Sequence, residues 1–209
     1  FYLLNFVLNH ATNHTPNVSY KQSKMKNFTD IFKKIGELSK ENETNLISSV
    51  KKVSFGPKTI LQKEGKVSDK IFIVEKGIVR AFYHKDGKDI TYAIATQNDF
   101  IGSMSSFFMQ TPSNKTVETI EDCVLWEFEY NKLQALFDMN PELGKAGRLF
   151  ANYGVADMEQ RFDNMMFYTA KERYEILLNN RPEVIQKVPL GMIASYLGIT
   201  QETLSRIRK

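Results

Sequence analysis

Residues 193–208 read IASYLGITQETLSRIR, and this stretch decides how the chain is interpreted. Two short helices that cross steeply need a small residue where they touch, and Ala194 provides it. The turn between them needs a backbone with positive φ, which Gly198 adopts without steric cost, and Thr200 can cap the second helix. Apolar residues that would fill the small core between the helices are Ile193, Leu197, Ile199, Leu204 and Ile207. The stretch therefore predicts a helix-turn-helix.

The exposed face of the second helix carries side chains that suit a DNA groove. Arg can bind guanine through two hydrogen bonds, Gln can bind adenine, and Glu can accept a hydrogen bond from cytosine. Thr, Ser and Lys can hold phosphates. We therefore predict DNA contacts from Thr200, Gln201, Glu202, Thr203, Ser205, Arg206 and Lys209. The alternative is an ordinary helical hairpin with a solvated polar face, which would have no salt-dependent affinity for DNA.

The composition permits a nucleic-acid partner without requiring one. The 209 residues carry a formal net charge of +4, and the fractions of hydrophobic (42%) and charged (25%) residues are those of a globular protein. Residues 171–209 hold seven Lys or Arg and four Glu, a balance of +3. Most of the positive excess therefore lies around the predicted helix-turn-helix.

Cysteine and histidine usage argues against several classes of protein. The single cysteine, Cys123, excludes an internal disulfide and, within one chain, a cysteine-ligated zinc or iron–sulfur site. It lies in a strand pattern, which favours a buried inert thiol over a redox switch. The histidines His10, His14 and His84 are scattered, so the clustered metal ligands of a cupin enzyme are not expected. With no partnered nucleophile and no phosphate-binding glycine loop, we expect no enzyme and no metal site.

Residues 1–24 differ from the rest of the chain. They contain no acidic residue and end just before Met25. Their first eight residues, FYLLNFVL, resemble a signal-peptide core but have no basic region before them and no small-residue cleavage pattern after them. We expect a loosely ordered or non-native extension, with folding from about Met25. No apolar run reaches the length needed to span a bilayer, so we expect a cytoplasmic protein.

Short apolar runs separated by turn residues begin at about Val50 and are typical of strands. Short helices over residues 25–48 precede them, and the tetrapeptide Lys85-Asp-Gly-Lys88 predicts a hairpin turn. Side chains expected on a common face are Ile90, Tyr92 and Ile94 in one run, and Val124, Trp126 and Phe128 in a later one. The pattern predicts an α+β fold whose first domain, 25–139, is a small antiparallel β-roll.

A long helix is predicted from Asn140 to about Met166. The tripeptide Asn-Pro-Glu at its start supplies a cap, a first-turn proline and a favourable negative charge. Two apolar stripes run along it, Leu143, Ala146, Phe150 and Tyr153 in one, and Ala151, Val155, Met158, Phe162 and Met165 in the other. The second stripe has the spacing of a coiled-coil seam. Either it packs on a partner subunit, or both stripes are intramolecular core.

A further helix is expected to begin after Thr169, which stands at capping-box spacing from Glu172. We place a domain boundary there, with a long dimerisation helix and hinge at 140–168 and a DNA-binding domain at 169–209. The segment from Lys171 to the end of the sequence predicts three short helices.

This layout resembles the Crp/Fnr family of bacterial transcription regulators, and particularly its short members from Bacteroidetes-type bacteria. The resemblance covers residues 26–209 and rests on Ile71-Phe-Ile-Val-Glu-Lys-Gly77, Asp99-Phe-Ile-Gly102 and residues 193–208. It implies a cyclic-nucleotide-binding-like, jelly-roll-like domain, a homodimer joined along the long helix, a near-palindromic operator and contact with RNA polymerase. Within the family's recognition helix, Glu202 and Arg206 match base-contacting positions. Gln201 stands where Arg is common, so we expect a different preferred DNA sequence.

The effector pocket departs from the family's cyclic-AMP pattern. A Gly-Glu pair that would hold the ribose is Gly102-Ser103 here, and the Arg-Ser or Arg-Thr pair that would hold the phosphate falls in Ser113-Asn-Lys-Thr116. Lys115 lacks the two-pronged fork of Arg. We therefore disfavour ordinary cyclic AMP and expect an unknown small effector or none. The candidate pocket residues are Gly102, Ser103, Met104, Ser105, Asn114, Lys115 and Thr116; Met104, Phe107, Phe108 and Met109 either form an apolar rim or fill the roll.

A different function for the same roll is a cyclic-nucleotide-binding module that regulates an attached enzyme or channel. That function would explain the strands but not the helix-turn-helix. Titration with cyclic AMP and cyclic GMP separates the two functions.

Overall fold

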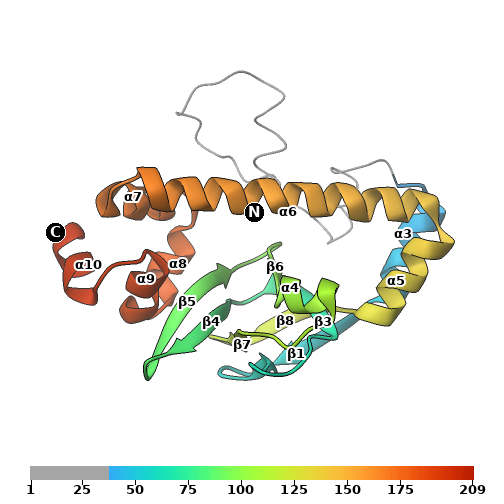
Figure 1. Ribbon diagram of the computed structural model, residues 1–209, viewed down its shortest axis with the longest axis horizontal. Helices are drawn as coiled ribbons and strands as arrows, with labels where there is room; N and C mark the ends of the chain where they lie inside the picture. Colours follow the sequence, from blue (N-terminus) through green and yellow to red (C-terminus); the bar gives the residue numbers. More distant parts are fainter. Residues whose placement is uncertain (1–37) are drawn as a thin grey trace, which may run out of the picture.

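One long helix lies along a β-roll in the computed structural model, with further helices at both of its ends (Figure 1). The structure describes residues 38–209. The predicted extension at 1–24 and the predicted helices before residue 38 lie outside this range. The first described helix, α3 (Lys40–Ser49), agrees with the helices predicted up to residue 48.

The predicted antiparallel roll is present, and it consists of two four-stranded sheets. One sheet has the order β1-β8-β3-β6 and the other β2-β7-β4-β5. Their bounds are β1 Lys51–Phe55, β2 Ile60–Gln62, β3 Lys70–Lys76, β4 Val79–Lys85, β5 Lys88–Ala95, β6 Phe100–Ile101, β7 Thr116–Thr119 and β8 Cys123–Glu129. Apolar side chains from both sheets, among them Phe72, Val74, Val79, Val117 and Leu125, meet in a closed core.

The hairpin between β4 and β5 turns at the predicted place. Gly87 adopts φ +73°, and Asp86 before it adopts φ +51°. The pairing then shifts register, since Ala81 pairs with Ala93 but Phe82 pairs with Thr91, which leaves Tyr92 without a partner in the ladder. Such a bulge re-aims side chains. The bulge at Tyr92 interrupts the predicted alternation of inward-facing and outward-facing side chains along β5. Thr91, beside the bulge, is buried.

Strand β8 is covered on both faces. Of the residues expected on one face, Phe128 is buried and Trp126 is partly buried against the same cluster. The opposite face, with Cys123 and Leu125, is at least as buried. A central strand of a closed roll has no solvated face, so period-two alternation alone could not identify its core side.

Helix α6 (Pro141–Phe167) follows α5 (Tyr130–Met139), and the short α4 (Met104–Met109), which the sequence did not predict, sits beside the roll. The Asn140 side chain caps α6 by accepting hydrogen bonds from the backbone N–H groups of Glu142 and Leu143. A Cβ on Gly147 would lie 2.7 Å from the Phe137 ring, so this glycine lets α5 and α6 pack closely.

Four helices follow α6, not the predicted three: α7 Ala170–Asn180, α8 Pro182–Lys187, α9 Leu190–Tyr196 and α10 Gln201–Ile207. The prediction was wrong because Pro182 forces a break and then begins a helix of its own. The predicted capping box at the start of α7 is present, since Thr169 and Glu172 bond reciprocally.

Candidate nucleic-acid interface and interdomain cavity

Helices α9 and α10 meet at the residues that the sequence singled out. Ala194 is 2% exposed at the crossing, and Gly198 has φ +68° in the turn. The Thr200 hydroxyl accepts a hydrogen bond from the backbone N–H of Thr203 at 3.2 Å, which caps α10. Their small core contains Ile193, Leu197 and Leu204, with Ile199 and Ile207 partly buried beside them.

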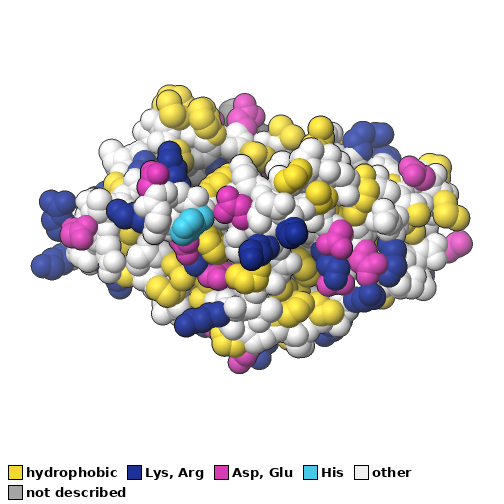
Figure 2. All heavy atoms as spheres, turned by 60° about the horizontal axis from the view of Figure 1, so that its bottom comes forward, with side chains coloured by type: hydrophobic (Ala, Val, Ile, Leu, Met, Phe, Trp, Pro, Cys, Tyr) yellow, Lys and Arg dark blue, Asp and Glu magenta, His cyan; other side chains and the backbone are white. Residues whose placement is uncertain are grey.

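The outer face of α10 is polar and open to solvent. Gln201, Glu202, Ser205 and Arg206 are exposed, and Lys and Arg side chains gather at this end of the molecule (left in Figure 2). The Glu202 carboxylate accepts hydrogen bonds from its own backbone N–H and from Thr200, and both lower its pKa. Glu202 is therefore a charged acceptor at neutral pH.

Two predicted contact residues also have structural roles. Thr203 is partly buried, and its hydroxyl accepts a hydrogen bond from Nη2 of Arg206 at 3.3 Å. Thr200 is engaged in the cap. The side chains on α10 that remain free of such roles are Gln201 and Ser205, with Lys209 just beyond its end.

The C-terminal helices pack directly on the β-roll. Ile78 and Ile94 of the roll share one core cluster with Tyr174, Val184 and the α9–α10 residues. The backbone N–H of Thr91 in β5 donates to the Ser195 hydroxyl of α9 at 2.9 Å. Strand β5 is thus the main support of α9.

A buried ion pair crosses the same junction. The Arg181 guanidinium, between α7 and α8, binds the Asp99 carboxylate and donates to the Ile94 carbonyl at 2.8 Å. Burial opposes the charge of Asp99, whereas the nearby Arg181 guanidinium and the Thr96 N–H favour it, and the pKa of Asp99 lies below its ordinary value. Asp99 belongs to a motif that the sequence identified, whereas nothing in the sequence pointed to Arg181 as its partner.

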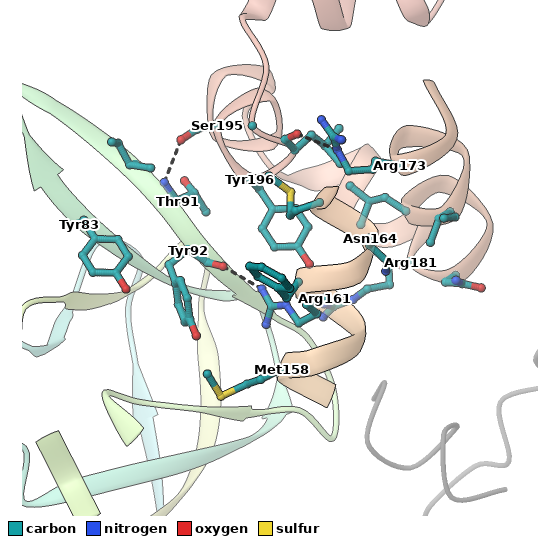
Figure 3. A pocket seen from close by; sticks show the side chains of 18 residues that line it. Tyr83, Thr91, Tyr92, Met158, Arg161, Asn164, Arg173, Arg181, Ser195 and Tyr196 are labelled. Atoms are coloured by element: carbon teal, nitrogen blue, oxygen red, sulfur yellow. Dashed lines mark hydrogen bonds between the residues drawn. The ribbon is translucent and has the colours of Figure 1, made fainter. Parts of the chain in front are cut away.

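A cavity of about 480 Å³ lies where the β4–β5 hairpin, α6, α7 and α9 meet (Figure 3). Its walls are largely apolar or aromatic, with three arginines among them. The apolar residues include Ile90, Met158, Phe162, Met165, Leu177 and Leu197; the tyrosines are Tyr83, Tyr92 and Tyr196; the arginines are Arg161, Arg173 and Arg181. The sequence alone did not point to this site, because its walls come from four separate segments.

None of the seven predicted effector residues lines this cavity, although Lys115 lies against two of its wall residues. Lys115 is 9% exposed, with its Nζ over the rings of Tyr92 at 4.6 Å and Tyr83 at 5.1 Å. Ser103 is fully buried, and its Oγ has no hydrogen-bond partner within residues 38–209. Gly102, Met104 and Thr116 are half-buried, and Ser105 and Asn114 are exposed.

The four apolar residues around α4 were expected either to form an apolar pocket rim or to fill the roll, and they do not all have the same surroundings. Phe107 is fully buried and fills the roll, while Phe108 (42% exposed) and Met109 (72% exposed) lie at the surface. Met104 packs against the core cluster from outside.

The two stripes of α6 have different surroundings. Leu143 and Ala146 are buried, and Phe150 and Tyr153 pack against the same cluster. On the other stripe Val155 is 67% exposed, Met158 58%, Phe162 64% and Met165 49%, and Ala151 is also exposed. In the single chain the second stripe is therefore not core.

The remaining candidate groups show no site of their own. Cys123 is buried, and burial raises the pKa of its thiol. His84 lies exposed near the end of β4, beside Asp89. Within the described range, no three His, Cys, Asp or Glu side chains are grouped to hold a metal ion. None of the helices from α3 to α10 has the length and apolar character to cross a membrane.

Comparison with known proteins agrees with this architecture. Residues 52–140 match the family model for the cyclic nucleotide-binding domain, which places the roll in that class. The chain is 25% identical over 165 residues to the cAMP-activated global transcriptional regulator CRP of Escherichia coli, covering 73% of this chain and 78% of that protein.

Solved structures share the fold. FixK2 of Bradyrhizobium japonicum superposes with a TM-score of 0.62 at 21% identity, covering 76% of this chain and 82% of that one. The c-di-GMP responsive regulator CLP of Xanthomonas campestris gives 0.59 at 18% identity, covering 81% and 89%. These structures show the fold that this chain shares with them, and the sequence match to CRP agrees with the resemblance to the Crp/Fnr family.

Proposed function

We propose that this protein is a sequence-specific transcription regulator that binds double-stranded DNA as a homodimer. The observation that carries the proposal is the α9–α10 pair, in which the turn at Gly198 leaves Gln201, Glu202 and Arg206 facing solvent on one helix. A recognition helix in a major groove has this arrangement. CRP, which resembles this chain, is itself a transcriptional regulator.

The dimer is supported by the exposed stripe on α6. A row of large apolar side chains open to solvent is typical of a protein interface. Two such stripes, packed together, would place two α10 helices on the same assembly, which suits a near-palindromic operator. The DNA-binding residues in this proposal are Thr200, Gln201, Glu202, Thr203, Ser205, Arg206 and Lys209, and the dimer contacts are Ala151, Val155, Met158, Phe162 and Met165.

The protein so described is a bacterial, cytoplasmic regulator without catalytic activity, and RNA polymerase is its further proposed partner. A cyclic-nucleotide-binding module without DNA affinity is the second candidate, because residues 52–140 match that domain. Titration of the chain with cyclic AMP and cyclic GMP, with and without DNA, distinguishes them.

Selection of bound fragments from random duplex DNA tests the proposal. We expect enriched sites with two half-sites, and affinity that falls steeply with salt because bound phosphates release counterions. Absence of duplex binding even at low salt would reject the function.

Arg206→Ala tests whether α10 reads bases. We expect a loss of about 1–3 kcal/mol in DNA binding and relaxed preference at one base position, because an arginine can contact guanine through two hydrogen bonds. The control is Arg148→Ala, an exposed arginine on α6. A uniform loss over all sequences would mean that Arg206 contacts only phosphate.

A further inference from the structure

The cavity between the roll and the C-terminal helices has the dimensions of a small-molecule site. Its volume of about 480 Å³ falls in the range of pockets that enclose drug-sized ligands, about 300–1,000 Å³. Such pockets are mostly apolar, with a few polar groups that fix the ligand. The cavity has this composition, with the rings of Tyr83, Tyr92 and Tyr196 beside aliphatic side chains (Figure 3).

The charges on the walls have one sign. Arg161, Arg173 and Arg181 line the cavity, and no Asp or Glu is among its described lining residues. Arg181 is neutralised by Asp99, and Arg173 donates to the carbonyls of Leu197 and Tyr168. Carbonyl groups do not cancel a charge, so Arg173 and Arg161 are both cations without a salt bridge in residues 38–209, and Arg161 has fewer of its N–H groups occupied.

Arg161 is held in place with most of its donors unused. Its Nη2 donates to the Tyr92 carbonyl at 2.8 Å, and its guanidinium carbon lies 5.5 Å and 5.6 Å from the ring centres of Tyr92 and Tyr196. Of the five N–H groups of a guanidinium, this hydrogen bond occupies one. Within the described part of the chain, Asp157, four residues earlier on α6, makes no salt bridge with Arg161. Burial lowers the pKa of Arg161, but the neighbouring Tyr196 and Asp157 raise it above its ordinary value, so the guanidinium stays charged. An arginine fixed between two aromatic rings is pre-organised to bind a carboxylate.

Two buried polar atoms in the same walls also lack partners. Thr91 is 4% exposed and Arg181 8%, and neither Oγ1 of Thr91 nor Nε of Arg181 has a hydrogen-bond partner within residues 38–209. Leaving such atoms unpaired costs free energy in a folded chain. Both residues line this one cavity, so its walls contain two buried polar atoms that could bond to a ligand.

We infer that this cavity binds a small organic anion, with an apolar ring or chain among the tyrosines and aliphatic residues and one carboxylate on Arg161. Neither Ser103 nor Lys115 of the predicted effector residues lines this site, although Lys115 lies over the rings of Tyr83 and Tyr92 in its wall. Its walls join the roll to α9 and include Met158, Phe162 and Met165 of the proposed dimer interface. A ligand there would therefore lie beside the partner subunit and change how the C-terminal helices sit on β5. Its role as an effector site rests on the proposed function, whereas binding itself does not.

Calorimetric titration of the full chain with ω-phenylalkanoates, from phenylacetate to 8-phenyloctanoate, tests the inference. Each acid is compared with the alcohol of the same chain length. We expect at least one acid to bind at least tenfold more tightly than its alcohol, because only the acid pairs with Arg161. No binding by any acid, or equal affinity for acid and alcohol, would overturn the inference.

Variants locate the binding. Arg161→Gln should weaken the acid at least tenfold and abolish the preference over the alcohol, whereas Arg148→Gln, on the same helix but outside the cavity, should leave both affinities unchanged. Ile176→Trp should weaken acid and alcohol together by filling the cavity. Unchanged acid binding in Arg161→Gln would reject the assigned site. The acid–alcohol comparison uses the unmodified chain and stays decisive if a variant does not fold.

The titration contains no DNA, so the two proposals can fail separately. A chain that binds the acid but no duplex keeps the cavity site and loses the proposed regulator. A chain that binds its operator but no acid loses the cavity site alone.

Discussion

The two ends of helix α6 have the same kind of sequence and opposite surroundings. In its first turns Leu143 is 1% exposed and Ala146 3%, because α5 and the roll cover them. In its later turns Val155 is 67% exposed and Phe162 64%. Both ends have apolar residues at helical spacing, so helix propensity does not separate them. The two ends differ in which elements pack against them. In the proposed dimer, a second copy of the chain would cover the exposed end.

Truncating one residue at each end should give very different losses of stability. Leu143→Ala should lower the free energy of unfolding by about 2–5 kcal/mol, because it leaves a cavity in packed core. Val155→Ala should change it by less than about 0.5 kcal/mol in the monomer, since Val155 is open to solvent. Urea unfolding at a concentration where the chain is monomeric measures both. Equal losses would mean that α6 is covered along its whole length.

A charge placed on the exposed end should act on association instead of folding. Phe162→Asp should raise the dimer dissociation constant about thirtyfold, or ~2 kcal/mol, if Phe162 is a central contact of the proposed interface. Met139→Asp is the control, because Met139 is 85% exposed but lies outside the stripe. Sedimentation equilibrium gives both constants. A tight dimer of Phe162→Asp would show that the subunits meet elsewhere.

The two glycines of α6 provide the mildest comparison. Gly154→Ala should stabilise the chain by up to about 1 kcal/mol, because nothing lies within 4 Å of the added Cβ and alanine favours the helix. At Gly147 the added Cβ would lie 2.7 Å from the Phe137 ring, so Gly147→Ala should cancel that gain or reverse it. Thermal unfolding of both variants measures the difference. An equal gain at both positions would contradict the close packing of α5 on α6.

Local chemistry explains which parts of the fold could be predicted. The caps at Asn140, Thr169 and Thr200 and the turns at Gly87 and Gly198 depend on residues a few positions apart, and the structure has all five. The extra helix at Pro182 was missed because a single residue divides it from α7.

The candidate site could be predicted only in part. The face of α10 follows from one short segment of sequence. The cavity around Arg161 depends on a β-bulge at Tyr92 and on the docking of α9 against β5, and both arise from contacts between distant segments. Such contacts leave no periodic signal in one sequence. Whether Ser103 and Lys115 bind any effector stays a prediction.

Met165 belongs to the proposed dimer interface and also lies beside the turn of the helix-turn-helix. It is 49% exposed on the stripe of α6, and a Cβ on Gly198 would lie 2.8 Å from its terminal methyl. In the proposed dimer, the rotamer of this flexible thioether would respond to the neighbouring subunit and, at the same time, support the bend before α10. Subunit pairing and the angle of the DNA-facing helix would then be mechanically linked through one methionine, with no relay of polar groups between them.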